Sequence, residues 1–219
     1  MKTIRRTGVL IATLGVTLGA PMARAQQPKA ANQPPPTNSD RHGALAAPSI
    51  SDRQGALAAP TIASALDKEF SVVEREVVSA AEAMPEEKYS FVPKDGEFKG
   101  VRTFGEQVRH IAAANFMLFG AFYGEKADFE VVEHGPANIT TKAQIVQYLK
   151  DSFAKGHKAI ATITPENAAT LVEAPPFSLV NTRLALASFA CAHSFDHYGQ
   201  IVVYLRLNGI VPPASRGGK

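Results

Sequence analysis

Two histidines four residues apart lie in a long apolar segment near the C-terminal end of the sequence. His193 and His197 belong to the stretch CAHSFDHYGQIVVYLR at 191–206, which reads as a buried helix. Because residues i and i+4 lie one turn apart on the same helix face, both imidazoles can bind one ion through neutral nitrogens. A third ligand must come from another segment. His110, in a second amphipathic pattern, is the best candidate, so the spacing predicts a three-histidine metal site.

Three imidazole ligands would leave coordination positions on a divalent ion open for water or substrate. Such a position could lower the pKa of bound water for hydrolysis, or hold a substrate thiol as its thiolate for group transfer. Zinc is the first expectation for the metal, and nickel, iron and manganese also suit imidazole. The residues therefore favour a metal-dependent hydrolase or transferase acting on a small molecule. The alternatives are a non-catalytic, metal-stabilised binding or stress-response module and a metal-free structural bundle.

Four polar residues could line a pocket or support the metal ligands: Glu106, Asp196, Gln200 and Tyr204. Glu106 precedes His110 by one turn, but a helix N-terminal capping box already explains it. Asp196 lies about 100° around the helix from His197, which favours a supporting or surface carboxylate over a general base. Gln200 and Tyr204 continue the histidine face. No catalytic residue is assigned.

The remaining candidates for chemistry receive structural roles. Cys191 lies about 200° around the helix from His193, so it should point away from the metal and act as a small buried apolar residue. As the only cysteine, it also cannot form an internal disulfide. His134 and His157 are expected at solvent-exposed positions.

Four helical patterns occur between residues 66 and 208. Their expected ranges are 66–84, 103–122, 141–163 and 182–208. Pro85 ends the first, capping boxes at Thr103/Glu106 and Thr141/Gln144 begin the next two, and Gly209 caps the last. Since no convincing alternating strand pattern occurs, the fold class is all-α, and four helices predict a four-helix bundle.

The connections suggest how these helices pack. Short loops between helices one and two and between helices three and four favour antiparallel neighbours. The longer connection at 123–140 permits a crossover between helices two and three. Helices two and four can then face each other, which would bring His110 opposite the His193/His197 pair.

The N-terminal 25 residues have the pattern of a bacterial signal peptide. Lys2, Arg5 and Arg6 precede an apolar stretch at 8–20, and Ala-Arg-Ala follows at 23–25. This stretch is too short to span a membrane, and nothing later offers the 18 or more apolar residues that a span needs. We expect export by the general secretory route and a periplasmic or secreted mature protein without a transmembrane span.

The mature chain is predicted to begin with a disordered tether. Residues 26–62 are rich in Pro and Ala, and the 12-residue segment SDRHGALAAPSI at 39–50 recurs as SDRQGALAAPTI at 51–62. Two short copies cannot bury a solenoid core, so a duplicated flexible linker is the simpler interpretation. One domain follows at 63–213, with a flexible tail at 214–219.

Charge gives no support for a nucleic-acid partner. The leader holds four of the 23 Lys and Arg residues and none of the 20 Asp and Glu residues, so the mature chain is nearly neutral. Nucleic-acid binding would need a clustered basic face. A small-molecule substrate or ligand is the expected partner, and a homodimer is left open.

Three motifs resemble the DinB/YfiT-like superfamily: MPEEKY near Met84, VRHIA around His110, and HSFDHYGQIVVYLRLNGIVPP from His193. The resemblance covers 63–213. It implies a four-helix bundle with up-down-down-up topology and a three-histidine metal site, whose ligands fall on His110, His193 and His197. Relatives of this type include thiol-dependent S-transferases and a maleylpyruvate isomerase, and many members have no assigned activity. Export makes thiol transfer less attractive, because the low-molecular-weight thiols are expected inside the cell.

Overall fold

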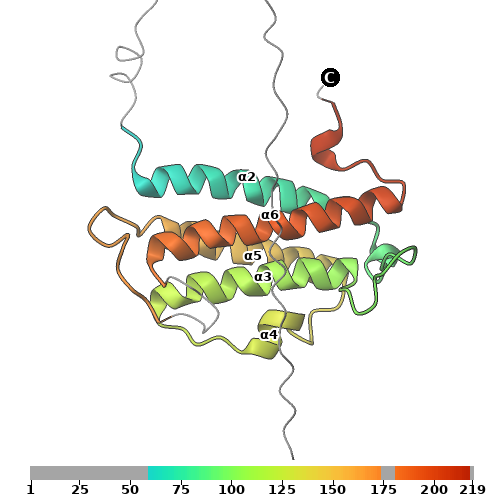
Figure 1. The fold of residues 1–219 in the computed structure, drawn as a ribbon, viewed down its shortest axis with the longest axis horizontal. Coiled ribbons are helices and arrows are strands. Elements are labelled where there is room, and N and C mark those ends of the chain that lie inside the picture. Colours follow the sequence, from blue (N-terminus) through green and yellow to red (C-terminus); the bar gives the residue numbers. More distant parts are fainter. Residues whose placement is uncertain (1–58, 174–180, 218–219) are drawn as a thin grey trace, which may run out of the picture. The chain divides into compact units, whose positions relative to one another are not determined.

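The computed structural model of the chain describes residues 59–173 and 181–217. The predicted signal peptide at 1–25, most of the predicted tether and the last two residues of the predicted tail lie outside the described residues. Helices dominate the described part, as Figure 1 shows: α2 (Ile62–Ala83), α3 (Phe104–Gly120), α4 (Phe129–His134), α5 (Lys142–Ile160) and α6 (Arg183–Leu207). An isolated bridge between Leu171 and Thr182 is the only β-pairing in this part. The all-α class is confirmed.

Threonine side chains begin the four long helices. Thr61, Thr103, Thr141 and Thr182 each accept a hydrogen bond from a backbone N–H in the first turn of the helix that follows. Both predicted capping boxes are present, and Ser64 completes a third with Thr61. Since α2 begins at Ile62, the last two residues of the second repeat copy form the cap and the start of this helix. None of the described helices is long and apolar enough to cross a membrane.

The long helices pack in a different neighbour pattern from the one expected. α2 packs mainly on α5 and α6, and α3 packs on the same two helices and on α4. The expectation that α2 and α3, and likewise α5 and α6, are close neighbours is therefore wrong. The connection at 84–103 can reach across the end of the bundle. Its Tyr89 side chain is buried, and the hydroxyl donates to the Ala81 carbonyl at 2.8 Å. The expected contact between helices two and four, α3 and α6, is present.

The core at the α2/α3/α5 contact is aromatic and tightly filled. Phe70, Phe119 and Phe153 are completely buried, with the Phe70 ring centroid 5.2 Å from that of Phe119 and 4.9 Å from that of Phe153. Gly156 of α5 lies against the first two rings. By contrast, α6 exposes several large apolar side chains on its outer side, among them Phe189, Val203 and Leu207.

His157 is not the solvent-exposed residue expected from the sequence. It packs edge-on against Phe70, and its Nδ1 and Nε2 lie 2.6 Å from Asp67 Oδ1 and 3.1 Å from Glu74 Oε2. Burial alone would lower the pKa of His157, but the hydrogen bonds and charges of the two carboxylates outweigh it and raise the pKa. This histidine therefore joins α5 to α2, and its two carboxylate partners favour the charged form of the imidazole. His134, as expected, is exposed.

The His157 contact makes the stability of the bundle depend on pH. A raised pKa in the folded state means that the contribution of His157 is complete below about pH 6.5, the unfolded value, and is lost as the pH rises through the folded value. We expect urea unfolding to show that His157→Gln destabilises the protein more at pH 5.5 than at pH 9. A difference that does not change with pH would contradict this assignment.

Candidate metal centre

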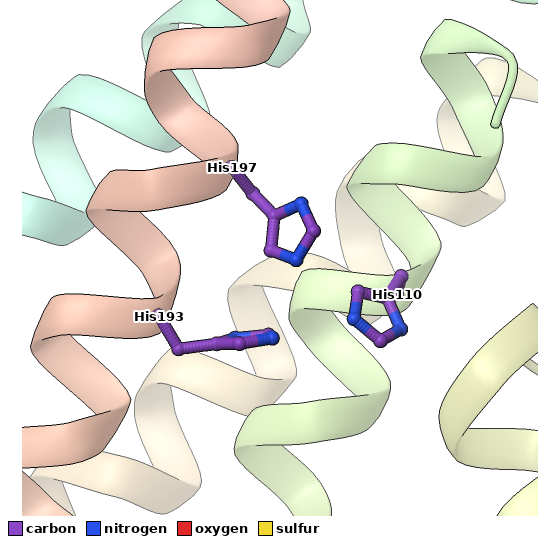
Figure 2. Close-up of side chains that lie close together, drawn as sticks. All are labelled: His110, His193 and His197. Atoms are coloured by element: carbon purple, nitrogen blue, oxygen red, sulfur yellow. The ribbon is translucent and has the colours of Figure 1, made fainter. Parts of the chain in front are cut away.

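The three histidines singled out from the sequence come together between α3 and α6. His110 extends from the middle of α3, and His193 and His197 extend toward it from successive turns of α6, as Figure 2 shows. One ligand nitrogen from each ring lies within 4.8 Å of the other two. The ring centroid of His110 is 5.1 Å from that of His193 and 4.7 Å from that of His197. The cluster could hold a metal ion, and its convergence speaks against the metal-free structural bundle.

Two of the three imidazoles are oriented by hydrogen bonds from Nδ1. His110 Nδ1 donates to the Val132 carbonyl at 2.7 Å, and His197 Nδ1 lies 2.7 Å from Gln107 Oε1. Because a carbonyl oxygen can only accept, Nδ1 of His110 carries the proton and its Nε2 keeps its lone pair. The Nδ1 of His193 is buried and has no hydrogen-bond partner among the described residues. A donor set of this kind fits a divalent ion such as zinc.

Burial keeps the histidines in the neutral form that metal binding requires. His110 and His197 are only 6% and 7% exposed. Desolvation lowers the pKa of His110, that of His193 to about 4, and that of His197 to about 3. Mutual repulsion among the rings and the charge of Arg102 act in the same direction. At neutral pH the site therefore presents three uncharged nitrogen donors.

The short helix α4 supports the cluster from outside. Its last turn presents successive carbonyls, of which that of Val132 accepts from His110 and that of Glu133 accepts from Arg102 Nε at 3.3 Å. Arg102 also forms an ion pair with the Glu133 carboxylate. These contacts satisfy carbonyl groups that have no partner at a helix C-terminus. The sequence of this region shows only a plain connection, so Arg102, Val132 and Glu133 were not predicted to be part of the site.

Of the four polar candidates, Gln200 and Asp196 connect to the histidine cluster, whereas Glu106 and Tyr204 have other partners. Gln200 and Asp196 are linked to His197 through Gln107, which was not predicted to be part of the site. Its position three residues before His110, on the same helix face, was the signal available for it. Glu106 caps α3 and lines a separate pocket. The Tyr204 hydroxyl donates to the Arg102 carbonyl at 3.0 Å, two turns beyond His197 along α6.

Cys191 takes the structural role expected for it. Its side chain is only 1% exposed, and burial, followed by the charge of Glu69, raises the pKa of the thiol to about 12. A thiol of this kind stays protonated at neutral pH and is a poor nucleophile.

The described residues form a helical bundle with a histidine cluster between two facing helices that could hold a metal ion. Comparison with known proteins gives the family. The DinB superfamily matches residues 69–201, which is more than half of the 219-residue chain. The chain belongs to the DinB superfamily. A crystal structure of a DinB-like protein from Bacillus cereus ATCC 10987 has a similar fold, with a TM-score of 0.54 and 15% identity, covering 70% of this chain and 95% of that one. Comparison with curated proteins found no match.

Proposed function

We propose that this DinB-family protein binds one divalent metal ion through His110, His193 and His197 and acts as a metal-dependent enzyme on a small molecule. The observation that carries the proposal is the convergence of three neutral imidazoles whose ligand nitrogens lie within 4.8 Å of one another. Zinc is the proposed metal, since tetrahedral sites with three protein nitrogens and one open position are typical of catalytic zinc.

The reaction is proposed to be a hydrolysis or a group transfer. A bound ion with an open position would polarise a substrate carbonyl or phosphoryl oxygen or activate a water. Two of the chain's own groups would orient the ligands: the Val132 carbonyl holds the His110 ring, and Gln107 holds that of His197. Hydrolysis is preferred over thiol transfer for an exported protein.

Export itself is part of the proposal and rests on the signal-peptide pattern of residues 1–25, which predicts a periplasmic or secreted protein. The proposed partner is a small-molecule substrate or ligand, with no role for nucleic acid because the mature chain is nearly neutral. Whether the domain forms a homodimer is left open, as in the sequence-based expectation.

The up-down-down-up topology is also a proposal. Contacts between helix ends support it. Lys142 at the start of α5 donates to the Met84 carbonyl at the end of α2, at 2.8 Å. Arg183 at the start of α6 donates to the Phe122 carbonyl beyond the end of α3, at 3.3 Å. Antiparallel α2/α5 and α3/α6 pairs agree with this order.

The direct test is the metal content of the protein. The chain from Gln26 would be purified without an affinity tag and analysed by elemental mass spectrometry. We expect about one ion per chain, and a His193→Ala/His197→Ala variant that folds but contains none, because one remaining imidazole cannot hold the ion. A folded wild-type protein that stays metal-free after incubation with zinc, nickel, iron and manganese would refute the proposal.

The rival function is a non-catalytic module in which the ion holds α3 and α6 together. The cluster does join these two helices, with α4 bound to it through Val132. A screen of esterase, amidase, phosphatase and thiol-transferase substrates, with and without chelator, distinguishes the enzyme from the non-catalytic module. Chelator-sensitive turnover supports the enzyme, whereas a large fall in melting temperature on chelation without any turnover supports the rival.

A further inference from the structure

Hydrogen bonds connect His197 to a carboxylate by way of two amide side chains. His197 Nδ1 lies 2.7 Å from Gln107 Oε1, and Gln107 Nε2 lies 2.8 Å from Gln200 Oε1. Gln200 Nε2 in turn lies 3.2 Å from Asp196 Oδ2. The chain starts on α6, crosses to α3 at Gln107 and returns to α6. It therefore joins two residues that are adjacent in sequence through groups on both helices.

The carboxylate fixes the direction of every bond in this chain. An ionised Asp196 can only accept, so Gln200 must turn its NH₂ group toward it and its oxygen toward Gln107. Gln107 must then offer its own NH₂ group to that oxygen, which leaves Oε1 facing His197. Because this oxygen can only accept, the proton of the neutral imidazole must lie on Nδ1.

We propose that Asp196, Gln200 and Gln107 are positioning residues that hold His197 as the Nδ1-protonated tautomer. In this tautomer Nε2 keeps its lone pair for an ion shared with His110 and His193. Figure 2 shows one ring nitrogen of His197 directed toward the other two histidines and the second directed away from them. Binding of a metal rests on the proposed function, but the tautomer is a property of the metal-free protein.

Burial strengthens the hydrogen bond between Gln107 and His197. Gln107 is 3% exposed and His197 is 7% exposed, so water competes little for the bond between them. Asp196 lies at the surface, where its carboxylate stays solvated. An exposed charge can thus set the proton position of a buried ring without being buried itself.

The test reads the tautomer directly by long-range ¹H–¹⁵N NMR on the metal-free mature chain at pH 8. The His197 signals would be assigned by comparison with His197→Gln. In the wild type we expect the proton on Nδ1. In Asp196→Asn the end group can donate as well as accept, the whole chain can reverse, and we expect a mixture of both tautomers. A wild-type ring protonated on Nε2, or an Asp196→Asn spectrum identical to that of the wild type, would overturn the proposal.

Two further variants separate this role from a general structural one. Asp151→Asn makes the same change at an equivalent exposed Gln–Asp bond on α5, where Gln147 Nε2 donates to Asp151 Oδ1 at 2.9 Å, and should leave the His197 signals unchanged. The double variant Gln107→Glu/Asp196→Asn places an acceptor-only group beside His197. It should therefore keep the proton on Nδ1 despite the loss of Asp196. If the folded double variant instead carried the proton on Nε2, the proposed positioning role of Asp196, Gln200 and Gln107 would be contradicted.

Zinc affinity gives a second readout. Gln107→Met removes the bond to His197 and should weaken zinc binding by about 10- to 100-fold, as is typical for residues that orient metal ligands. Asp196→Asn should weaken zinc binding only about twofold, because half of the molecules keep the Nδ1-protonated tautomer that can bind the ion. Equal losses of zinc affinity in Gln107→Met and Asp196→Asn would contradict the proposed positioning role. If the wild type bound no zinc, the proposed function would fail while the NMR result would still decide the tautomer.

Discussion

His110→Ala is expected to weaken zinc binding by about 100-fold or more, while His134→Ala leaves it unchanged. A structural zinc site contributes at least about 10 kcal/mol of binding free energy, so one of three ligands accounts for about 3 kcal/mol, which is roughly two decades in affinity. His134 is the matched control, since it is a histidine of the neighbouring helix α4 with a 70% exposed side chain. Competition with a chromophoric chelator would measure both affinities.

The stability of the His110→Ala protein must be measured beside its affinity. His110 is 6% exposed and bonds to the Val132 carbonyl, so its removal also frees a carbonyl at the end of α4. His110→Gln is a useful second variant, because it retains a polar side chain in this space and supplies a poorer ligand for zinc. Zinc affinity within threefold of the wild type in both folded variants would exclude His110 as a ligand.

The spacing of the histidines was sufficient to predict that two of the three imidazoles converge. His193 and His197 are one helical turn apart, and this relation follows from helix geometry alone. The addition of His110 required α3 to face α6, which the sequence only permitted. The prediction succeeded there because both helices carry a continuous apolar face that must be buried.

The surroundings of the site were harder to predict, because they depend on tertiary contacts. α4 has only six residues, which is too short to show a helical period, and its carbonyls acquire their role only where the chain folds back on His110. Gln107 and Gln200 are separated by 93 positions, so nothing local indicates their bond. The neighbour pattern was predicted wrongly for the same reason, since the length of the 84–103 connection does not tell which helix comes next to α2.

Gly156→Ala is expected to destabilise the bundle by about 2 kcal/mol although alanine is the better helix former. A Cβ at this position would lie 2.4 Å from Phe70 Cε1 and 2.7 Å from Phe119 Cε2. Both rings are completely buried and cannot move away without disturbing the core. Overpacking of this kind costs up to about 3 kcal/mol, and the gain in helix propensity offsets about 1 kcal/mol of it.

Gly199→Ala on α6 is the matched control, because a Cβ there meets nothing within 4 Å. It should stabilise the protein by up to about 1 kcal/mol, so the two glycines should respond to the same change with opposite signs. Urea unfolding of both variants measures this difference. In a Phe70→Leu background the cost of Gly156→Ala should fall, because the two closest atoms belong to the Phe70 ring. A Gly156→Ala protein as stable as the wild type would mean that α5 lies farther from α2 than this packing requires.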